Sequence, residues 1–552
     1  MYYPPNYPVE EKEQLIKLTE QIIKNQDSIT SREKLRKKIN RIIEQIGYKR
    51  QPKLWMIYFT YLRFLSKKQI SEKLLDLLRV VKIRSLSGIV PLSVFTKPED
   101  SCPYNCVYCP IAENAPKSYF PDEAAVRRAI RHNYDPFEQT FGRLLQFYLS
   151  GHNINKVDVI IQGGTFSFYP LDYRKEFVKR IFDACNCDYE QLIKTGSFKK
   201  FYKKAKDLNS AKQINETAKS RIVGITIETR PDFINEQEII FLRKLGVTRV
   251  ELGVQTTDEN ILRLIKRGHT VNDLYKATYL LKEAGFKVTY HLMPGLPGST
   301  VEKDIAMLKE VFTDERLKPD SIKFYPTQVV YNSQLLNWYQ NKLYKPITEQ
   351  ELTKIVLEFK KNIVPEWLRI QRLVRDLTKN DIAVATFPAN YRQNLHQELK
   401  KQNIHCPCIR CREIRNHKIK PPIKLKTIKY KSANGLEYFI EDCDSNNRVL
   451  GFLRLRIPEH QINKNSFFIK PISESALIRE LHIYGKAVSF NEKGKTQHRG
   501  LGTKLILQAI KIAKKHNCQK ISVISGVGVR NYYRKFGFRL EHNTDYMFLN
   551  LS

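Results

Sequence analysis

The sequence predicts an α/β protein in which a helical region precedes a partial (β/α)6 barrel and a second, smaller α/β domain. Six short β-rich runs alternate with helical stretches between about residues 89 and 330, an order that favours a parallel sheet curled into an incomplete barrel. A further set of strands falls in the last part of the chain. Its 552 residues suffice for three or four domains of roughly 100–200 residues each.

Four regions follow one another along the chain. Residues 1–80 are expected to form a basic helical region, because apolar residues recur there at helical spacing. Residues 81–330 hold the barrel, whose catalytic groups should lie where the strands end. The segment 331–425 is predicted to be a helical linker with a cysteine metal site, and residues 426–552 form the smaller domain.

Within these regions, each strand is expected where β-branched and other apolar residues form a short run. The barrel strands are expected at 89–95, 157–162, 222–228, 249–255, 288–293 and 322–325. Those of the smaller domain are expected at 438–441, 450–456, 476–484 and 521–525. Two prolines in the stretch 418–426 lack backbone N–H groups, so this stretch is expected to be a linker rather than a helix.

The composition restricts the class of protein before any motif is considered. The chain carries 94 Lys and Arg against 57 Asp and Glu, a formal net charge of +37, which indicates a polyanionic partner. With 42% hydrophobic residues it has ample material for buried cores, which excludes disordered and fibrous classes. No run reaches the ~18 apolar residues of a membrane span, and the first residues lack the apolar core of a signal peptide. We therefore expect a cytoplasmic protein without a membrane partner.

Three cysteines follow the first barrel strand in the sequence SCPYNCVYCP. Cys102, Cys106 and Cys109 have the spacing C-x3-C-x2-C, which can hold three irons of a 4Fe-4S cluster and leave the fourth iron open to a ligand. A structural zinc site with a fourth ligand elsewhere is the alternative at this point. The spacing therefore indicates a metal centre at the catalytic end of the barrel.

Further residues around this loop resemble the radical S-adenosylmethionine (SAM) enzymes, which bind SAM through its amino and carboxylate groups at the open iron. An aromatic residue precedes the third cysteine, and a Gly-Gly pair follows the second strand, where the superfamily contacts the adenine and the SAM amine. Polar residues end otherwise apolar strands in ITIETRP and ELGVQ; each alone is typical of a satisfied buried group, but together they favour one lined pocket. The expected SAM-binding residues are Tyr108, Gly163, Gly164, Glu228, Arg230 and Gln255.

The smaller domain contains the sequence QHRGLG (497–502) where a helix is expected to begin. Glycines let the backbone approach a ligand closely, and free N–H groups at a helix N-terminus hold phosphate; the alternative is a simple helix cap. This motif, the strand IRELHIY and the stretch NYYRKFGF resemble the GNAT superfamily of N-acetyltransferases, which implies acetyl-CoA as the ligand. In such domains a tyrosine lies near the thioester, so Tyr533 is the first candidate and Tyr532 the second, unless the two tyrosines only pack.

Longer segments resemble one family that joins both domains, the catalytic subunits of Elongator in the single-subunit form found outside eukaryotes. They include SGIVPLSVFTKP, CPYNCVYCP, RAIRHNYDPFEQT, HLMPGLPG and SGVGVRNYYRKFGF, and the match runs from about residue 80 to the C-terminus. The resemblance implies an acyltransferase that forms 5-carboxymethyluridine at the wobble uridine of the tRNA anticodon stem-loop, from acetyl-CoA by SAM radical chemistry. It also implies a reductant for the cluster, whereas additional Elongator-type subunits are not required.

The same resemblance assigns catalytic roles to Lys156 and Tyr533 and locates the contacts with acetyl-CoA. The expected contacts are Lys156, Glu480, Leu481, His482, Ile483, Gln497, Gly500, Leu501, Gly502, Thr503 and Tyr533. Contacts with tRNA are expected from the basic N-terminal helices, since phosphates attract Lys and Arg. The basic candidates are the run 34–41 together with Lys199, Lys200, Lys203 and Lys204.

A second cysteine cluster, HCPCIRC, lies near the end of the predicted linker region. Cys406, Cys408 and Cys411 supply three sulfurs. Because a structural zinc normally takes four ligands, His396 is expected as the fourth, with His417 as another candidate. Incidental cysteines are the alternative to this zinc site.

Two other functions remain open at this stage. The first is a protein (histone-type) lysine acetyltransferase with a structural iron-sulfur platform, which predicts acetylation that survives loss of the cluster. The second is an RNA-binding scaffold without turnover. The complete cysteine and glycine motifs argue against that scaffold.

Overall fold

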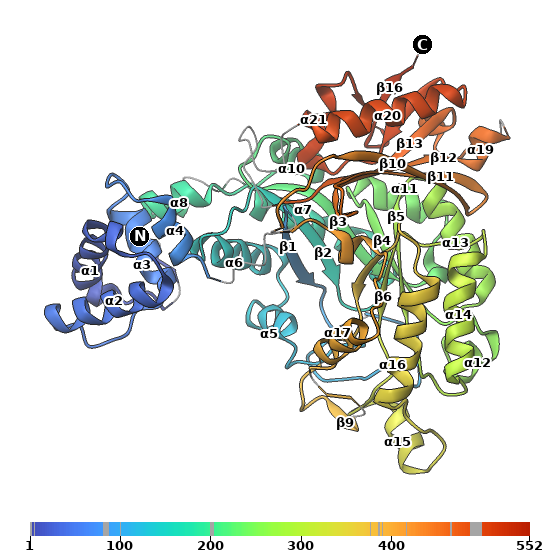
Figure 1. Ribbon diagram of the computed structural model, residues 1–552, viewed down its shortest axis with the longest axis horizontal. Helices are drawn as coiled ribbons and strands as arrows, with labels where there is room; N and C mark the ends of the chain where they lie inside the picture. Colours follow the sequence, from blue (N-terminus) through green and yellow to red (C-terminus); the bar gives the residue numbers. More distant parts are fainter. Residues whose placement is uncertain are drawn as a thin grey trace.

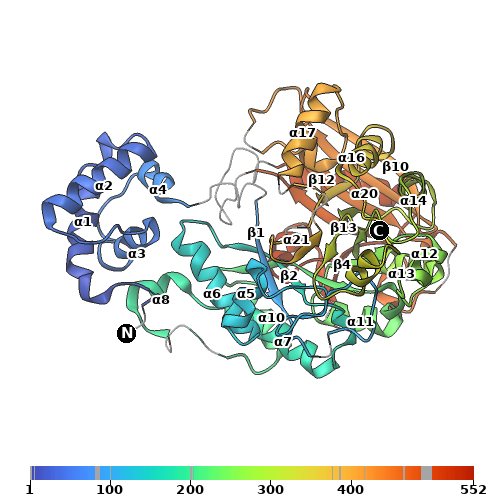
Figure 2. The same ribbon diagram turned by 90° about the horizontal axis from the view of Figure 1, so that it is seen from below.

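The computed structural model describes all of the chain except residues 1–2, 5, 81–87, 100, 199–201, 203, 376, 385–386, 389, 416, 464–465, 486–499, 542 and 552. A helical N-terminal lobe projects from a larger body in both views of the molecule (Figures 1 and 2). In the described part of the chain, the strands of this body form two seven-stranded sheets and one two-stranded sheet. The expected α/β class is therefore confirmed.

Four helices build the N-terminal lobe: α1 (Lys12–Lys24), α2 (Arg32–Ile46), α3 (Leu54–Phe64) and α4 (Glu72–Leu78). Their apolar faces meet in a core to which Leu15, Leu18 and Ile22 contribute fully buried side chains. The Ser31 side chain accepts a hydrogen bond from the Lys34 N–H at 3.2 Å and caps α2. The basic residues of this helix lie on its exposed face, as the pattern predicts.

The first large sheet is the barrel, and all of its strands run parallel in the order β1-β2-β3-β4-β5-β6-β8. Its strands are β1 (Val90–Phe95), β2 (Lys156–Gln162), β3 (Arg221–Thr229), β4 (Arg249–Gln255), β5 (Lys287–Leu292), β6 (Ser321–Phe324) and β8 (Arg369–Arg372). The six expected strands are all present, each within one residue of the expected bounds.

Helices connect the barrel strands, and several of them cover the outer face of the sheet (Figure 1). They are α5 (Ala124–Arg131), α6 (Pro136–Leu149), α7 (Leu171–Cys185), α8 (Tyr189–Thr195), α10 (Leu208–Asn215), α11 (Glu236–Lys244), α12 (Glu259–Leu264), α13 (Val271–Glu283) and α14 (Val301–Thr313). Helices α8 and α10 fall in the Lys-rich segment between β2 and β3. No helix in the described residues combines the length and the apolar character needed to cross a membrane.

The segment after the sixth strand differs from the helical linker that we expected. It contains α15 (Gln334–Gln340), α16 (Glu349–Glu358), α17 (Tyr391–Lys401) and α18 (Ile409–Arg412), but also β7 (Val329–Val330), β8 and β9 (Ile382–Val384). The four-residue strand β8 pairs with β6 and extends the barrel. Its sequence, RIQR, has a single apolar residue, so no apolar run marks it as a strand.

The second sheet has the order β10-β11-β12-β13-β14-β16-β15. Its strands are β10 (Lys424–Ser432), β11 (Gly435–Cys443), β12 (Val449–Ile457), β13 (Ser475–Ile483), β14 (Lys520–Val523), β15 (Arg539–Glu541) and β16 (Tyr546–Asn550), with α19 (Glu459–Ile462), α20 (Leu501–Lys515) and α21 (Arg530–Arg534). Strand β10 already begins inside the expected linker 418–426. Strand β10 is absent from the predicted strands because alternating lysines hide its apolar side. The short strands β15 and β16 are absent from them as well.

Buried charges hold the two sheets together. Arg479 on β13 binds Asp320 of the barrel with nitrogen–oxygen distances of 2.9 and 2.5 Å, and Glu437 on β11 at 3.0 Å. Lys282 on α13 lies 3.7 Å from the same glutamate. Because the side chains of all four residues are almost fully buried, this network fixes how the two domains face one another.

Candidate active site

The cysteine loop lies at the carboxyl ends of the barrel strands, where Cys102, Cys106 and Cys109 line a cavity of about 350 Å³. Lys117 fixes this loop, since its Nζ donates to the backbone carbonyls of Cys102 and Tyr104 at 3.1 and 2.9 Å. Burial raises the pKa of the Cys109 thiol to about 12, so a nearby cation is needed to hold this sulfur as a thiolate. The irons of a cluster supply such charge.

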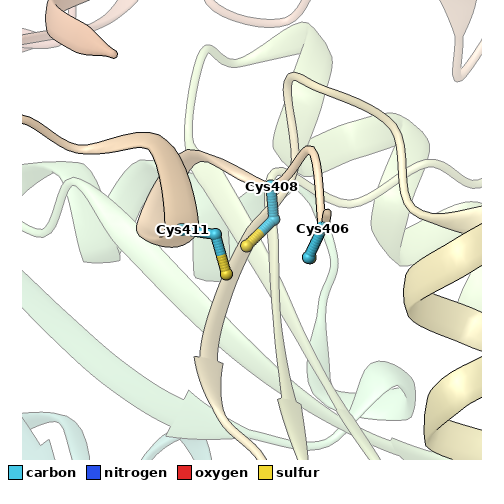
Figure 3. A group of neighbouring side chains, drawn as sticks. All are labelled: Cys406, Cys408 and Cys411. Atoms are coloured by element: carbon cyan, nitrogen blue, oxygen red, sulfur yellow. The ribbon is translucent and has the colours of Figure 1, made fainter. Parts of the chain in front are cut away.

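The two cysteine clusters differ in how closely their sulfurs approach one another. Those of Cys406, Cys408 and Cys411 all lie within 4.8 Å of each other, and Figure 3 shows two of the side chains converging. Three sulfurs on one tetrahedral zinc lie about 3.8 Å apart, given Zn–S bonds of about 2.3 Å. The three barrel cysteines, all in the described part of the chain, do not meet the 4.8 Å limit. This wider spacing fits a cluster in which each thiolate binds a different iron.

The glycine pair after β2 lets the end of this strand approach the cysteine loop. Gly163 and Gly164 have φ angles of +124° and +90°. A Cβ atom on Gly163 would lie 2.1 Å from Thr96 Oγ1, and one on Gly164 would lie 2.4 Å from the carbonyl oxygen of Ser101. Both positions therefore require glycine, and Gly164 lines the cavity.

Most residues expected to bind SAM lie around this first cavity. Its lining includes Tyr108, Gly164, Glu228, Arg230 and Gln255, whereas Gly163 is not part of the lining.

Glu228 is held in a network of protein hydrogen bonds. Its carboxylate accepts hydrogen bonds from the Tyr119 hydroxyl at 2.6 Å and from the Gln162 side-chain nitrogen at 3.3 Å. It also lies 3.3 Å from Lys323 Nζ. Each of its two oxygens thus already has a partner within the protein.

Arg230 keeps a donor available beside the cysteine loop. Its guanidinium lies 3.6 Å from the centre of the Tyr104 ring and binds Asp232 at 3.0 Å. The remaining nitrogen, Nη1, is buried and has no hydrogen-bond partner among the described residues. A carboxylate bound in the cavity would satisfy this orphaned donor, as the carboxylate of SAM could.

A second, larger cavity of about 1010 Å³ lies between the two sheets and reaches into the barrel. Strand β13 pairs with β14 from Ser475 to Ile478 and then continues to Ile483 along the wall of the cavity. The edge of this strand beyond Ile478 therefore lies where an extended ligand in the cavity would run. The amide groups of a strand edge match those of the pantetheine arm of CoA.

The helix α20 begins beside this edge. Gly500 precedes it with a φ of +82° and has no side chain that could cap the first N–H groups. A Cβ atom on Gly502 would lie 2.4 Å from the hydroxyl oxygen of Tyr532, so glycine permits the contact between this ring and the helix. Free N–H groups at a helix N-terminus favour anions, which is the chemistry that a pyrophosphate needs.

All the described residues among the expected acetyl-CoA contacts line this second cavity; Gln497 lies outside the described residues. The lining residues from that set are Lys156, Glu480, Leu481, His482, Ile483, Gly500, Leu501, Gly502, Thr503 and Tyr533. Tyr532 lines the cavity as well, so both tyrosines stay candidates for the residue near the thioester.

The charged groups of this cavity have shifted pKa values. Burial lowers the pKa of the Lys156 ammonium to about 8. Burial opposes ionisation of Glu480, but the charges of Lys287 and Arg454 outweigh it and lower the pKa of Glu480 to about 2. For Tyr533, burial raises the pKa above its ordinary value, so the hydroxyl keeps its proton at neutral pH.

The linker cysteines have a different neighbour from the one we expected. His396 lies on the exposed side of α17, and the group of atoms within 4.8 Å in the described residues contains only the three cysteines. The charge of the buried Lys360 instead acts on these cysteines, and although burial opposes this, their sulfurs raise the pKa of its ammonium. Helical spacing cannot show which residues of α17 approach the cysteines, and His396 lies outside the group of atoms within 4.8 Å of one another. His417 is exposed too.

Three residues around the cavities were not singled out from the sequence. Arg267 donates to Cys106 Sγ at 3.5 Å and to the Gly253 carbonyl, and it lies in the segment KRGHTV. Gln162 and Lys323 line the interior of the barrel. Period-2 alternation along their strands marks both as inward-facing polar residues, a signal that could have identified them.

The fold and the two cavities define a radical SAM enzyme joined to an acetyltransferase domain. Residues 96–311 match the radical SAM superfamily, residues 319–401 match the radical SAM C-terminal domain, and residues 409–538 match the acetyltransferase (GNAT) family. The radical SAM superfamily binds a 4Fe-4S cluster and SAM, and the GNAT domain binds acetyl-CoA. A 4Fe-4S cluster, SAM and acetyl-CoA are therefore the three groups that these families imply for this chain.

Similar proteins narrow this class to one family. The chain is 40% identical over 485 residues to the tRNA uridine(34) acetyltransferase of Methanocaldococcus jannaschii, covering 84% of this chain and 85% of that protein. It is 34% identical to human Elongator complex protein 3, covering 86% of each chain. The structure of Elp3 from Methanocaldococcus infernus, lacking its N-terminus, has a TM-score of 0.71, with 36% identity over 84% of this chain and 100% of that one. The chain belongs to the family of tRNA uridine(34) acetyltransferases and Elongator complex protein 3.

Proposed function

We propose that this protein modifies the wobble uridine of tRNA and forms 5-carboxymethyluridine from acetyl-CoA. One observation carries the proposal: the two cavities meet inside the barrel, because Ser93, Gln162 and Arg372 line both of them. A base at this junction would face the cysteine loop on one side and acetyl-CoA on the other. The names of the relatives, which refer to uridine 34 of tRNA, agree with such a substrate.

Each part of the site has its own task in this proposal. When bound, the cluster and SAM supply hydrogen-atom abstraction, directed at the methyl group of acetyl-CoA. Lys156, the last residues of β13 and the start of α20 are proposed to hold acetyl-CoA, while the buried Tyr533 lies in the same cavity and is proposed to face the thioester. Enclosure of the base at the junction is proposed to exclude bulk water and so to protect a reactive carbon.

The test is anaerobic reconstitution of the full chain with iron, sulfide and a reductant, followed by incubation with SAM, acetyl-CoA and unmodified tRNA. Mass spectrometry of the tRNA nucleosides should detect 5-carboxymethyluridine only when all components are present. Acetylation of added protein substrates without SAM, and no modified nucleoside, would instead support a lysine acetyltransferase.

The charge of Lys156 should make acetyl-CoA binding depend on pH. Since the pKa of this ammonium is about 8, the side chain loses its proton as the pH rises from 7 to 9.5. We expect the affinity for acetyl-CoA to fall roughly fivefold to thirtyfold over that range, the value of a charge-assisted hydrogen bond. Isothermal titration calorimetry with Lys156→Arg, which keeps its charge, should give a nearly flat profile. A wild-type profile equally flat would contradict the proposed contact.

The three linker cysteines are proposed to hold one structural zinc, with Lys360 as a buried positive charge beside the thiolates. The variant Cys408→Ser should lose most of the roughly one equivalent of zinc that such a site holds and should unfold at a lower temperature. The control is His396→Ala, which should keep its zinc because this side chain lies away from the sulfurs. Loss of zinc from the control, measured by mass spectrometry of metals, would show that the histidine is a ligand.

The exposed basic residues of α2 are proposed to contact tRNA phosphates. We expect the tRNA dissociation constant to rise on the order of 10³-fold between 50 and 200 mM salt, because bound phosphates release counterions. The variant Lys34→Ala/Arg36→Ala should reduce the slope of log K against log salt, whereas Lys309→Ala on the distant helix α14 should not. Equal slopes for all three proteins, measured by fluorescence anisotropy, would exclude α2 from the contact.

A further inference from the structure

The junction of the two cavities is lined by polar side chains from three barrel strands. Ser93 comes from β1, Gln162 from β2 and Arg372 from β8. Beside them, Lys323 lines the larger cavity and lies 3.3 Å from Glu228, which lines the smaller one. A ligand that occupies this junction therefore meets hydrogen-bonding groups rather than an apolar wall.

The orientation of the Gln162 side chain follows from its neighbours. The nitrogen Nε2 lies 3.3 Å from Glu228 Oε1 and 3.4 Å from the Tyr119 hydroxyl. Because that hydroxyl donates to the other oxygen of Glu228 and Lys323 donates to Oε1, the carboxylate is an acceptor and must face the NH2 end of the amide. The carbonyl oxygen of Gln162 accordingly points elsewhere, and no described residue donates a hydrogen bond to it.

This oxygen is a fixed acceptor on a residue that lines the junction, where the proposed function locates the target base. Uracil presents a donor, N3–H, between two carbonyl acceptors, whereas cytosine presents an acceptor at N3 and a donor at the neighbouring amino group. A fixed acceptor accepts the hydrogen bond from N3–H of uracil, but it repels the N3 lone pair of cytosine. Donors for the uracil carbonyls are close, since the Ser93 hydroxyl lines the same junction.

We infer that Gln162 binds N3–H of the target uracil and sets the preference for uridine over cytidine at the modified position. The inference rests on the proposed function, which requires the base at this junction. Tyr119, Lys323 and Glu228 act through Gln162: they hold its amide nitrogen, so the acceptor cannot rotate to become a donor. Such a pre-oriented acceptor discriminates more strongly than one that is free to flip.

The test compares synthetic anticodon stem-loops with uridine, cytidine or 3-methyluridine at position 34. In the reconstituted wild-type protein, uridine should be modified, and the other two should react roughly 10–100-fold more slowly in kcat/KM, the effect of one lost buried hydrogen bond. Gln162→Met, which keeps the volume but removes the acceptor, should lower kcat/KM for uridine by a similar factor. In this variant, kcat/KM for the uridine stem-loop should exceed that for the cytidine stem-loop by no more than about threefold.

A second variant tests the same contact by size. Gln162→Ala opens space at N3, so the 3-methyluridine stem-loop should now react at close to the rate of the uridine stem-loop. The matched control is Gln371→Met, a glutamine that lines only the larger cavity and should keep the wild-type ratio. The dissociation constant for acetyl-CoA, measured by calorimetry, should stay within about threefold of wild type in all variants, which shows that they remain folded.

The outcomes separate the inference from the function on which it rests. If the wild-type protein modifies uridine and Gln162→Met keeps the full preference over cytidine, the inference is overturned and the proposed function stands. If Gln162→Ala still rejects 3-methyluridine as strongly as wild type does, the contact with N3 is likewise overturned. If the wild-type protein cleaves SAM and binds acetyl-CoA but modifies no stem-loop, the proposed function fails, and the inference fails with it.

Discussion

Replacement of Cys102 by alanine is expected to abolish carboxymethylation of tRNA while acetyl-CoA binding stays intact. This cysteine shares a cavity with Cys106 and Cys109, and each of the three sulfurs is expected to hold one iron. Removal of one ligand leaves an incomplete cluster that cannot present SAM in a fixed geometry. We expect activity to fall on the order of 10³-fold or more, since the groups of such a site act as a unit.

The measurement combines iron content, visible absorption of the cluster, SAM cleavage and tRNA nucleoside analysis. Cys518→Ala is the matched control, because this buried cysteine lies in the second domain at the start of β14 and lines neither cavity. It should retain the cluster and the activity. Normal levels of modified nucleoside in Cys102→Ala would refute the radical route and favour the platform role of the barrel.

The second large effect is expected at the buried contact between the two domains. Arg479→Met leaves Asp320 and Glu437 without their main hydrogen-bonded cation, and both carboxylates are buried. Removing one partner of a buried ionic network costs about 3–5 kcal/mol of the free energy of unfolding. We expect that loss here, together with weaker acetyl-CoA binding, because β13 carries both Arg479 and the residues that line the second cavity.

Denaturant unfolding measures this loss, with Arg316→Met as the control. Arg316 pairs with Asp314 at an exposed position, where an ion pair contributes about 0–1 kcal/mol. Burial opposes ionisation of Asp320, but Arg479 and Lys282 lower its pKa, so its contribution is complete at neutral pH and is lost only in acid. An Arg479→Met protein as stable as the control would show that the network contributes little.

Local sequence patterns predicted a large part of this protein. The six barrel strands, the helical N-terminal lobe and the smaller α/β domain follow from apolar periodicity, which a strand or helix carries within a few residues. Both cysteine clusters follow from spacing, because ligands within one loop must reach the same metal site. The SAM contact expected of the glycine pair Gly163-Gly164 stays a prediction, whereas the lack of room for a side chain at both positions is seen only in the structure.

The relation between distant segments was decided only by the tertiary structure. The four-residue segment β8 becomes a strand because it pairs with β6, and no pattern in its own sequence indicates that partner. His396 was expected beside the linker cysteines, but the packing of α17 leaves it exposed and the buried Lys360 takes the place next to the sulfurs. Helix orientation of this kind depends on contacts across the fold.

The sequence by itself determined which chemistries the chain contains: a cysteine loop for a cluster, a glycine-rich helix start for CoA and an excess of positive charge for RNA. Each of these is a local property, set by residues close together in the chain. That the two chemistries share one interior was decided by the fold, through contacts such as Gln162 with Glu228 and Arg479 with Asp320. The physical reason is that a cavity consists of side chains from many strands, and only closure of the barrel against the second sheet brings them together.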